Sequence, residues 1–234
     1  MPTLRSLFGH VLNPRRALTI LRDRRAHPWT STDAVRKRQY GSYAEYVAHQ
    51  KQKLDANPSE WLLAHEQEYP EVLAKRLQGL GVVKPGMTVL CLAARLGGEV
   101  RAFIGLGCFA VGLDLNPGSS NKYVLTGDFH DLQFGAGTVD LLFCNALDHA
   151  FDIPKMMAEC RRVLKPEGHL ILEIVNGETQ GYEAGHFEAI IWDKVDDVVS
   201  VVCQIGFTVV RRQEIEHPWQ GEIMSLSPSP RPES

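Results

Sequence analysis

The chain has 234 residues, of which 44% are hydrophobic and 23% charged, and its formal net charge at pH 7 is -3. This composition is that of a folded domain with a sizeable core, and it excludes a disordered chain. No apolar run reaches the roughly 18 residues of a membrane-spanning helix, which excludes an integral membrane protein. The five cysteines form no CxxC pair and mostly sit in apolar patterns, so we expect reduced core residues in a cytoplasmic protein.

The first 40 residues form a separate electrostatic unit. They carry nine Lys and Arg and two Asp, a net charge of +7, which leaves -10 for the remainder of the chain. Apolar residues recur there at helical spacing beside the arginines. Residues 1–40 are therefore predicted to be a basic arm with three open roles. It could lie on an anionic membrane surface, pack on the domain or on the second subunit of a homodimer, or act as an organelle transit peptide.

Two helices are predicted after the arm, over residues 43–56 and 59–79. Asn57-Pro58 separates them, Ser59 is a candidate N-cap, and Gly79 ends the second helix. Together they make a helical segment over residues 41–80 ahead of the first strand.

From Met87 onward, short Val/Ile/Leu-rich runs alternate with amphipathic stretches, which predicts a parallel sheet covered on both faces. The expected strands cover 88–93, 109–114, 123–127, 139–145, 168–175, 207–215 and 221–227, and the expected helices cover 97–106, 153–164 and 187–205. No helix separates the last two strands, so they should form an antiparallel hairpin. This α/β domain is assigned to residues 81–228, followed by a flexible tail over 229–234.

Asp114 ends an apolar strand 17 positions after Gly97. In an αβ unit that spacing places a carboxylate near ribose hydroxyls, although an aspartate that only shapes the turn before Asn116 would have the same position. Gly127-Asp128-Phe129 follows the next predicted strand, and Asn145-Ala146-Leu147-Asp148-His149 follows the one after that.

The stretch from Val89 to Ile174 resembles class I S-adenosylmethionine-dependent methyltransferases of the small-molecule type. The likeness rests on the Gly97-Gly98 turn, on Asp114, on Gly127-Asp128-Phe129, and on the run Arg162-Val163-Leu164-Lys165-Pro166-Glu167-Gly168. It implies a Rossmann-like seven-stranded, mostly parallel sheet with a terminal antiparallel hairpin and an N-terminal helical extension. It also implies S-adenosyl-L-methionine as cofactor.

The resemblance implies a set of cofactor-binding residues at the ends of successive strands: Ala93, Arg95, Gly97, Asp114, Leu115, Asp128, Phe129, Asn145 and Ala146. The loop departs from the family's acidic-x-Gly-x-Gly-x-Gly pattern, because Cys91 replaces the acid and only the last glycine remains. Alanine would fail a glycine's need for positive φ. Arg95 could pair either with the methionine carboxylate or with Glu99, four residues further on.

The same resemblance implies that the two N-terminal helices cover the cofactor and the acceptor. Possible pocket residues on the first helix are Tyr43, Tyr46, His49, Gln50 and Lys53, each of which could equally be a packing or surface residue.

His149 is a candidate general base, with Asp148 or Asp152 as the carboxylate that orients it. It could instead line the cofactor pocket or be a plain surface histidine. These three residues could also hold a metal, but the segment has no recognised ligand motif, and no metal is expected.

The predicted function is methyl transfer from S-adenosylmethionine to a small molecule, with a sugar or glycolipid precursor as the expected acceptor. The main alternative is a cofactor-binding pseudo-methyltransferase with a regulatory or structural role. An NAD-dependent oxidoreductase is disfavoured because G-x-G-x-x-G is missing. No nucleic-acid partner is expected, because no motif for holding a flipped base is present.

Overall fold

The computed structural model describes residues 27–30, 33–55 and 60–230. The expectations for most of the basic arm, including membrane binding and transit, fall on residues outside these ranges, as do the Ser59 cap and the last four residues. No helix in the described part of the chain has both the length and the apolar content to cross a membrane.

Seven strands form the central sheet, parallel except at one side. Their order across the sheet is β4 (Val124–Thr126), β3 (Phe109–Asp114), β2 (Thr88–Leu92), β5 (Val139–Cys144), β6 (Leu164–Val175), β9 (Gly221–Pro228) and β8 (Phe207–Ile215). The strands from β4 to β6 pair in parallel, whereas β9 pairs antiparallel with both β6 and β8. The predicted fold class and terminal hairpin are confirmed. Strand order reverses between β2 and β5, where open α/β sheets bind their ligands.

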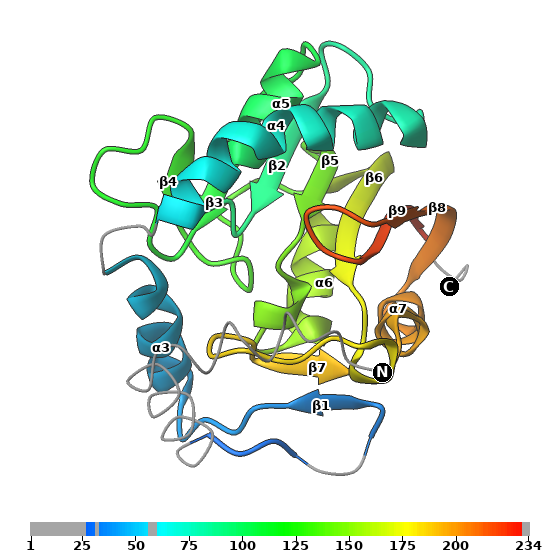
Figure 1. Cartoon of the computed structure of the whole chain (residues 1–234). Coiled ribbons are helices and arrows are strands. Elements are labelled where there is room, and N and C mark those ends of the chain that lie inside the picture. The colour runs from blue at the N-terminus through cyan, green and yellow to red at the C-terminus, as the bar shows by residue number, and fades with distance from the viewer. Residues whose placement is uncertain (1–26, 31–32, 56–59, 231–234) are drawn as a thin grey trace.

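Helices cover both faces of the sheet (Figure 1). One face carries α4 (Glu60–Leu80) and α5 (Gly98–Gly105), and the other carries α6 (Ile153–Val163) and α7 (Val195–Gln204). The strands between them are nearly all apolar, as two-sided burial requires. Four of the five cysteines are buried core residues, as expected, and none forms a disulfide: Cys91, Cys108, Cys144 and Cys160.

One helix and a small two-stranded sheet lie beyond the carboxyl ends of β2 and β5 (Figure 1). They are α3 (Tyr43–Asp55) and a pair of antiparallel strands, β1 (Val35–Lys37) and β7 (Ile190–Trp192). The predicted helix over 187–205 is therefore wrong in its first half, because the helix begins only at Val195. The apolar run of β7 is buried against β1, and the acidic residues after it sit in the first turn of α7, where they complement the helix dipole. Residues 35–37, assigned to the arm, thus form a strand of this sheet.

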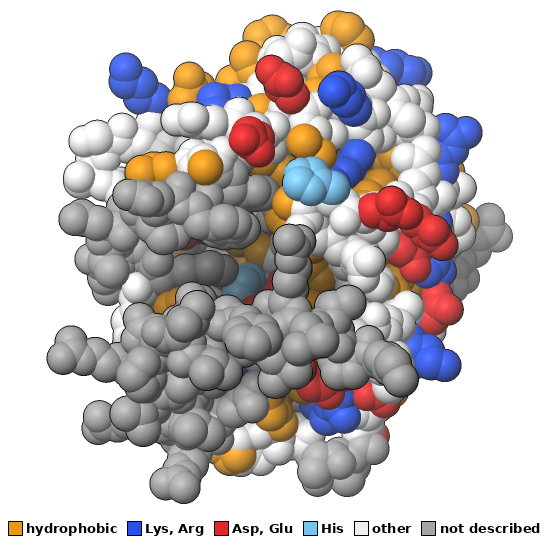
Figure 2. All heavy atoms as spheres, viewed as in Figure 1, with side chains coloured by type: hydrophobic (Ala, Val, Ile, Leu, Met, Phe, Trp, Pro, Cys, Tyr) orange, Lys and Arg blue, Asp and Glu red, His pale blue; other side chains and the backbone are white. Residues whose placement is uncertain are grey.

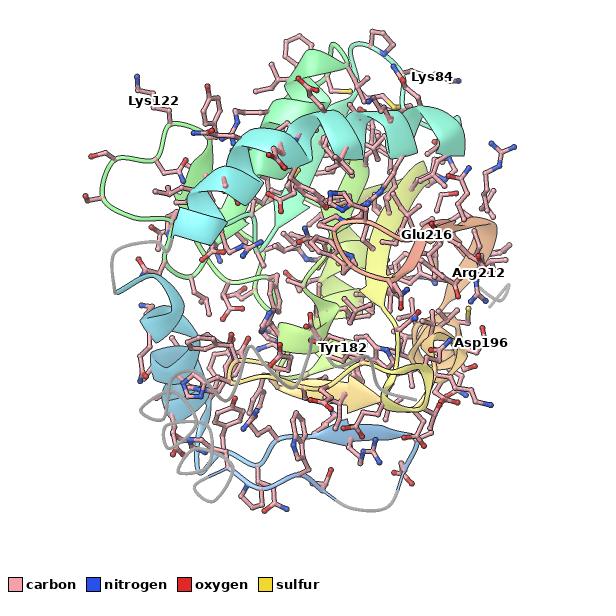
Figure 3. The ribbon with its side chains drawn as sticks, viewed as in Figure 1. Lys84, Lys122, Tyr182, Asp196, Arg212 and Glu216 are labelled. Atoms are coloured by element: carbon pink, nitrogen blue, oxygen red, sulfur yellow. The ribbon has the colours of Figure 1, made fainter. Side chains whose placement is uncertain are left out.

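Two short 3-10 helices complete the described elements, η1 (Leu147–His149) and η2 (Glu178–Gln180). The hairpin side of the molecule is held by charged pairs, since Arg212 on β8 donates to Asp196 on α7 at 2.7 Å (Figure 3). Figure 2 shows acidic and basic side chains interleaved over this flank instead of gathered by sign. Ser229, assigned to the tail, is bound to the domain through its N–H, which donates to the Gly206 carbonyl at 2.9 Å.

Candidate functional site

The loop between β2 and α5 has positive φ at three residues, only one of which is a glycine. Ala93 and Arg95 have φ of 54° and 41°, and Gly97, just before α5, has φ of 88°. The left-handed region costs a non-glycine residue roughly 1 to 2 kcal/mol. The Arg95 backbone N–H donates to Oδ2 of Asp114 at 3.0 Å, so the neighbouring strand helps to hold this conformation. Ala93 therefore adopts a positive φ, although alanine was expected to disfavour that conformation.

Asp114 ends β3 beside this loop, at the edge where strand order reverses. Its Oδ1 accepts the backbone N–H of Asn116 at 2.8 Å, while Oδ2 accepts that of Arg95. The side chain is half-buried. Each oxygen uses one lone pair on a backbone amide and keeps the other for a ligand, so the carboxylate is fixed in direction and can still accept. Leu115, the next residue, is also half-buried.

Asp128 is tied to a buried histidine and to helix α3. The N–H of Asp152 donates to Nε2 of His130 at 3.1 Å, which leaves the ring proton on Nδ1. That Nδ1 lies 2.9 Å from Oδ1 of Asp128, and the Tyr43 hydroxyl donates to Oδ2. Although burial acts in the opposite direction, these bonds hold the pKa of Asp128 below its ordinary value. The side chain of Phe129 is buried in the core.

His149 is oriented by a backbone carbonyl. Its Nδ1 lies 2.9 Å from the carbonyl oxygen of Phe187, so Nδ1 carries a proton and donates it to this carbonyl. Nε2 lies 3.8 Å from Oδ2 of Asp148. Asp152, the other candidate partner, instead caps α6 by accepting the N–H of Lys155 at 3.0 Å. Among the described residues, no group of three or more His, Cys, Asp or Glu is placed to hold a metal.

A buried polar network that the sequence did not reveal begins at Asn145, just after β5. Its Nδ2 donates to Oε1 of Glu99 at 2.9 Å and to the hydroxyl oxygen of Tyr69 at 3.1 Å. Tyr69 donates to Oε2 of Glu173 at 2.5 Å, and Arg76 donates to Oε1 of the same carboxylate at 2.6 Å. The network joins α4, α5 and two central strands directly behind the loop. Glu173 interrupts the apolar run over residues 170–175, which was the available sequence signal.

The expected surface pair between Arg95 and Glu99 is not formed. Glu99 is 1% exposed and bonds to Asn145, so it is a buried residue of the α5 first turn. No hydrogen bond or ion pair to the Arg95 side chain occurs among the described residues. Its charge nevertheless lowers the pKa of Glu99, against the stronger effect of burial. Ala146, another expected cofactor residue, is buried.

Helix α3 covers the carboxyl edge of the sheet through bonds to three loops. These bonds run from Tyr43 to Asp128, from Tyr46 to the His149 carbonyl at 3.0 Å, and from Gln50 to the Phe187 carbonyl at 2.7 Å. His49 is buried and lies 2.9 Å from the Tyr40 hydroxyl through Nδ1. The side chain of Lys53 lies outside the described part of the chain. Three of the five expected cover residues thus reach the candidate site.

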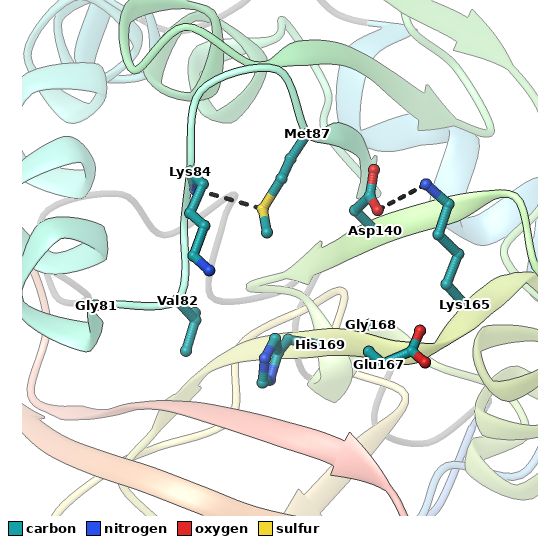
Figure 4. Close-up of a pocket in the computed structure, with 9 residues that line it drawn as sticks. All are labelled: Gly81, Val82, Lys84, Met87, Asp140, Lys165, Glu167, Gly168 and His169. Carbon is teal, nitrogen blue, oxygen red and sulfur yellow. Dashed lines mark hydrogen bonds and ion pairs between the residues drawn. The ribbon is translucent and has the colours of Figure 1, made fainter.

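A pocket of about 320 Å³ lies at the opposite edge, where the strands begin (Figure 4). Lys165 pairs there with Asp140 at 2.7 Å, and Lys84 and His169 also line the pocket. The pocket contains none of the residues expected to bind a cofactor or to catalyse a reaction. It is therefore separate from the candidate site.

Comparison with known proteins identifies the central unit. A family model described as a methyltransferase domain matches residues 90–172, the span from β2 to β6. The recognition of the class I superfamily is confirmed, and the loop, Asp114, Asp128 and Asn145 all lie within the matched methyltransferase domain.

One curated relative matches part of the chain. A malonyl-[acyl-carrier protein] O-methyltransferase of Coxiella burnetii is 29% identical over 107 residues, 42% of this chain. The matched part spans only 38% of that relative's length.

Two solved structures share the fold of the whole methyltransferase domain. The 1,6-didemethyltoxoflavin-N1-methyltransferase of Burkholderia thailandensis, solved with 1,6-didemethyltoxoflavin and S-adenosylhomocysteine bound, has a TM-score of 0.64 at 14% identity, covering 86% of this chain and 99% of that one. A SAM-dependent methyltransferase of Aquifex aeolicus has a TM-score of 0.56 at 21% identity, covering 75% and 96%. At these identities the likeness shows the fold.

Proposed function

We propose that this chain binds S-adenosylmethionine at the carboxyl edge of β2, β3 and β5 and transfers its methyl group to a small-molecule acceptor. The observation that carries the proposal is the Asp114 carboxylate, which is fixed by two backbone amides beside a loop with positive φ at three residues. The family match over residues 90–172 supports the same reading.

The donor set at this edge fits such a cofactor. Asp114 keeps one free lone pair on each oxygen, which suits two adjacent ribose hydroxyls. Arg95 offers a guanidinium group that can bind the cofactor's carboxylate. A side chain at position 97 would clash with Tyr123, because a Cβ on Gly97 would lie 2.9 Å from the Cβ of Tyr123. At Oδ2 of Asp128 the adenine amino group would compete with the Tyr43 hydroxyl, which already donates to that oxygen.

When bound, the cofactor supplies a methyl group on an activated sulfonium. The chain's own residues then have to align an acceptor and exclude water. Helix α3 closes the site from outside through Tyr46 and Gln50. His149, with its proton on Nδ1, offers Nε2 as an acceptor for a proton that an oxygen or nitrogen acceptor loses.

A ring-shaped acceptor, such as a sugar or a glycolipid precursor, suits the aromatic lining near His149. Tyr46 and Phe151 lie 5.2 Å apart between ring centroids, and Tyr43 lies 5.2 Å from the same Phe151. Aromatic walls with a few polar groups are typical of small-molecule sites. The 1,6-didemethyltoxoflavin bound in the Burkholderia thailandensis structure supports a small-molecule acceptor.

A second candidate is a pseudo-methyltransferase that binds the cofactor without turnover. The bond between Tyr43 and Asp128 favours it, because α3 then occupies a group that the cofactor needs. Stoichiometric binding with no methyl transfer to any acceptor pool would support this candidate over the enzyme.

Calorimetry with S-adenosylhomocysteine and with NAD tests the proposed function. We expect saturable binding of the first and none of the second. Saturable NAD binding without a response to the sulfur nucleoside would overturn the assignment. Transfer of a labelled methyl group to sugar or lipid fractions then tests the acceptor class.

A further inference from the structure

Two buried glutamates beside the β2–α5 loop each have a carboxylate oxygen without a hydrogen-bond donor. Glu66 on α4 is 4% exposed and Glu99 on α5 is 1% exposed. Within the described part of the chain, Oε1 of Glu66 and Oε2 of Glu99 have no hydrogen-bond partner. Buried carboxylate oxygens are normally satisfied, because an unpaired one loses its hydration without compensation. These two oxygens therefore lack the hydrogen-bond donors that buried carboxylate oxygens normally have.

The remaining oxygens of both carboxylates are fixed at the start of α5. The Gly98 backbone N–H lowers the pKa of the Glu66 carboxyl, and a Cβ on Gly98 would lie only 2.7 Å from Oε2 of that residue. Arg101 lies 3.5 Å from the same oxygen through Nη2. Glu99 is held on the other side by Asn145. In each side chain one carboxylate oxygen is held by neighbouring groups, and the other is buried without a hydrogen-bond partner.

Burial outweighs the charges of the nearby arginines at this pair of glutamates. Burial and, next, the charge of Glu66 raise the pKa of Glu99 to about 7. Burial also raises the pKa of Glu66, against the opposing effects of Arg95 and Arg101. The other acidic group behind them, Glu173, is already paired with Arg76. Near neutral pH the two glutamates therefore hold a proton that a cationic ligand would displace.

We propose that Glu66 and Glu99 bind the α-ammonium group of the cofactor's methionine moiety, while Arg95 binds its carboxylate. An ammonium group carries three N–H donors and can satisfy both open oxygens at once. Cys91, which stands where the family has its acid, is buried and uncharged, so it cannot serve this purpose. The loop, which lacks the family's acid and all but the last of its glycines, would thus bind an amino-acid zwitterion together with side chains from α4 and α5. This inference rests on the proposed function.

The first test compares S-adenosylhomocysteine with its deaminated analogue, which keeps the carboxylate. The proteins are the wild type, Glu66→Gln, Glu99→Gln and the control Glu68→Gln, an exposed residue of the same helix. We expect each of the two site variants to lose about ten- to a hundredfold in affinity for S-adenosylhomocysteine and little for the analogue, because only the first carries the ammonium. The control should match the wild type, and thermal unfolding checks that each variant is folded.

A second measurement follows the displaced proton. Calorimetry in buffers of different ionisation enthalpy should show proton release when S-adenosylhomocysteine binds to the wild type near pH 7, and less release in Glu99→Gln. Equal losses for both ligands, or unchanged affinity in both site variants, would overturn the inference and leave the two glutamates as a pair that only shares a proton. Failure of the proposed function looks different, because the wild type would then bind neither ligand.

Discussion

Replacing Asp114 by asparagine removes one carboxylate charge while keeping the size of the side chain. Hydrogen bonds to a charged group contribute about 1.5 to 3 kcal/mol, so cofactor affinity should fall by about 10- to 150-fold. One of the two backbone amides that the carboxylate now accepts would also face an amide nitrogen. We therefore expect the free energy of unfolding to fall by about 1 kcal/mol as well. Calorimetry with S-adenosylhomocysteine measures the first effect, and urea unfolding measures the second.

The matched control is Asp140→Asn at the opposite edge of the sheet. Asp140 likewise accepts a backbone N–H, from Thr88 at 2.8 Å, and also the Lys165 ammonium at 2.7 Å. This variant should lose stability and keep cofactor affinity. Equal affinity in the wild type and in Asp114→Asn would refute the ribose assignment. A parallel loss in both variants would show that the effect comes from general destabilisation.

Four further outcomes are expected. His149→Gln should lower turnover by about 10²-fold or more with cofactor affinity nearly unchanged if Nε2 acts as a base; a fall in affinity at unchanged maximal rate would instead make it a pocket wall. Tyr43→Phe should raise cofactor affinity by about two- to tenfold, because the adenine amino group no longer competes with a hydroxyl for Asp128, and calorimetry showing no gain would separate Asp128 from the adenine site. Although burial opposes them, bonds from Lys165 and Thr88 lower the pKa of Asp140 to about 2, so its stabilising effect is complete above the unfolded pKa near 4 and is lost as pH falls toward 2. Acid unfolding of Asp140→Asn should lack that dependence. Deleting residues 1–26 should abolish any salt-sensitive binding to anionic liposomes in a sedimentation assay, and equal binding by the truncated protein would remove the membrane-surface role.

Most elements of the methyltransferase domain could be predicted because their signals are local. Short Val/Ile/Leu runs mark the strands, and the absence of a helix between the last two strands specifies the hairpin. The prediction failed at 187–194, where an apolar run pairs with β1 more than 150 residues earlier in the chain. A short apolar run can form either a strand or a helix, and here the pairing with β1 determines that it forms a strand.

The candidate site shows the same division. The positions of Asp114, Asp128 and His149 follow from strand order, because the carboxyl ends of parallel strands meet at one edge. Their hydrogen bonds do not follow: Tyr43 reaches Asp128 from α3, and the Phe187 carbonyl orients His149 in place of a carboxylate. Such contacts join segments far apart in sequence, and spacing along the chain does not encode them.

The sequence by itself determined the order of the elements, the edge at which ligands bind, and the residue types available there. Only the tertiary structure decided the conformation of the loop and the surroundings of Glu99, for which local spacing had left a surface pair with Arg95 open. Packing of α4 over α5 buries that carboxylate next to Glu66 and Asn145, and burial changes its charge state and its partners. The physical reason is that the desolvation of a side chain depends on which segments pack against it, and its neighbours along the chain do not specify that packing.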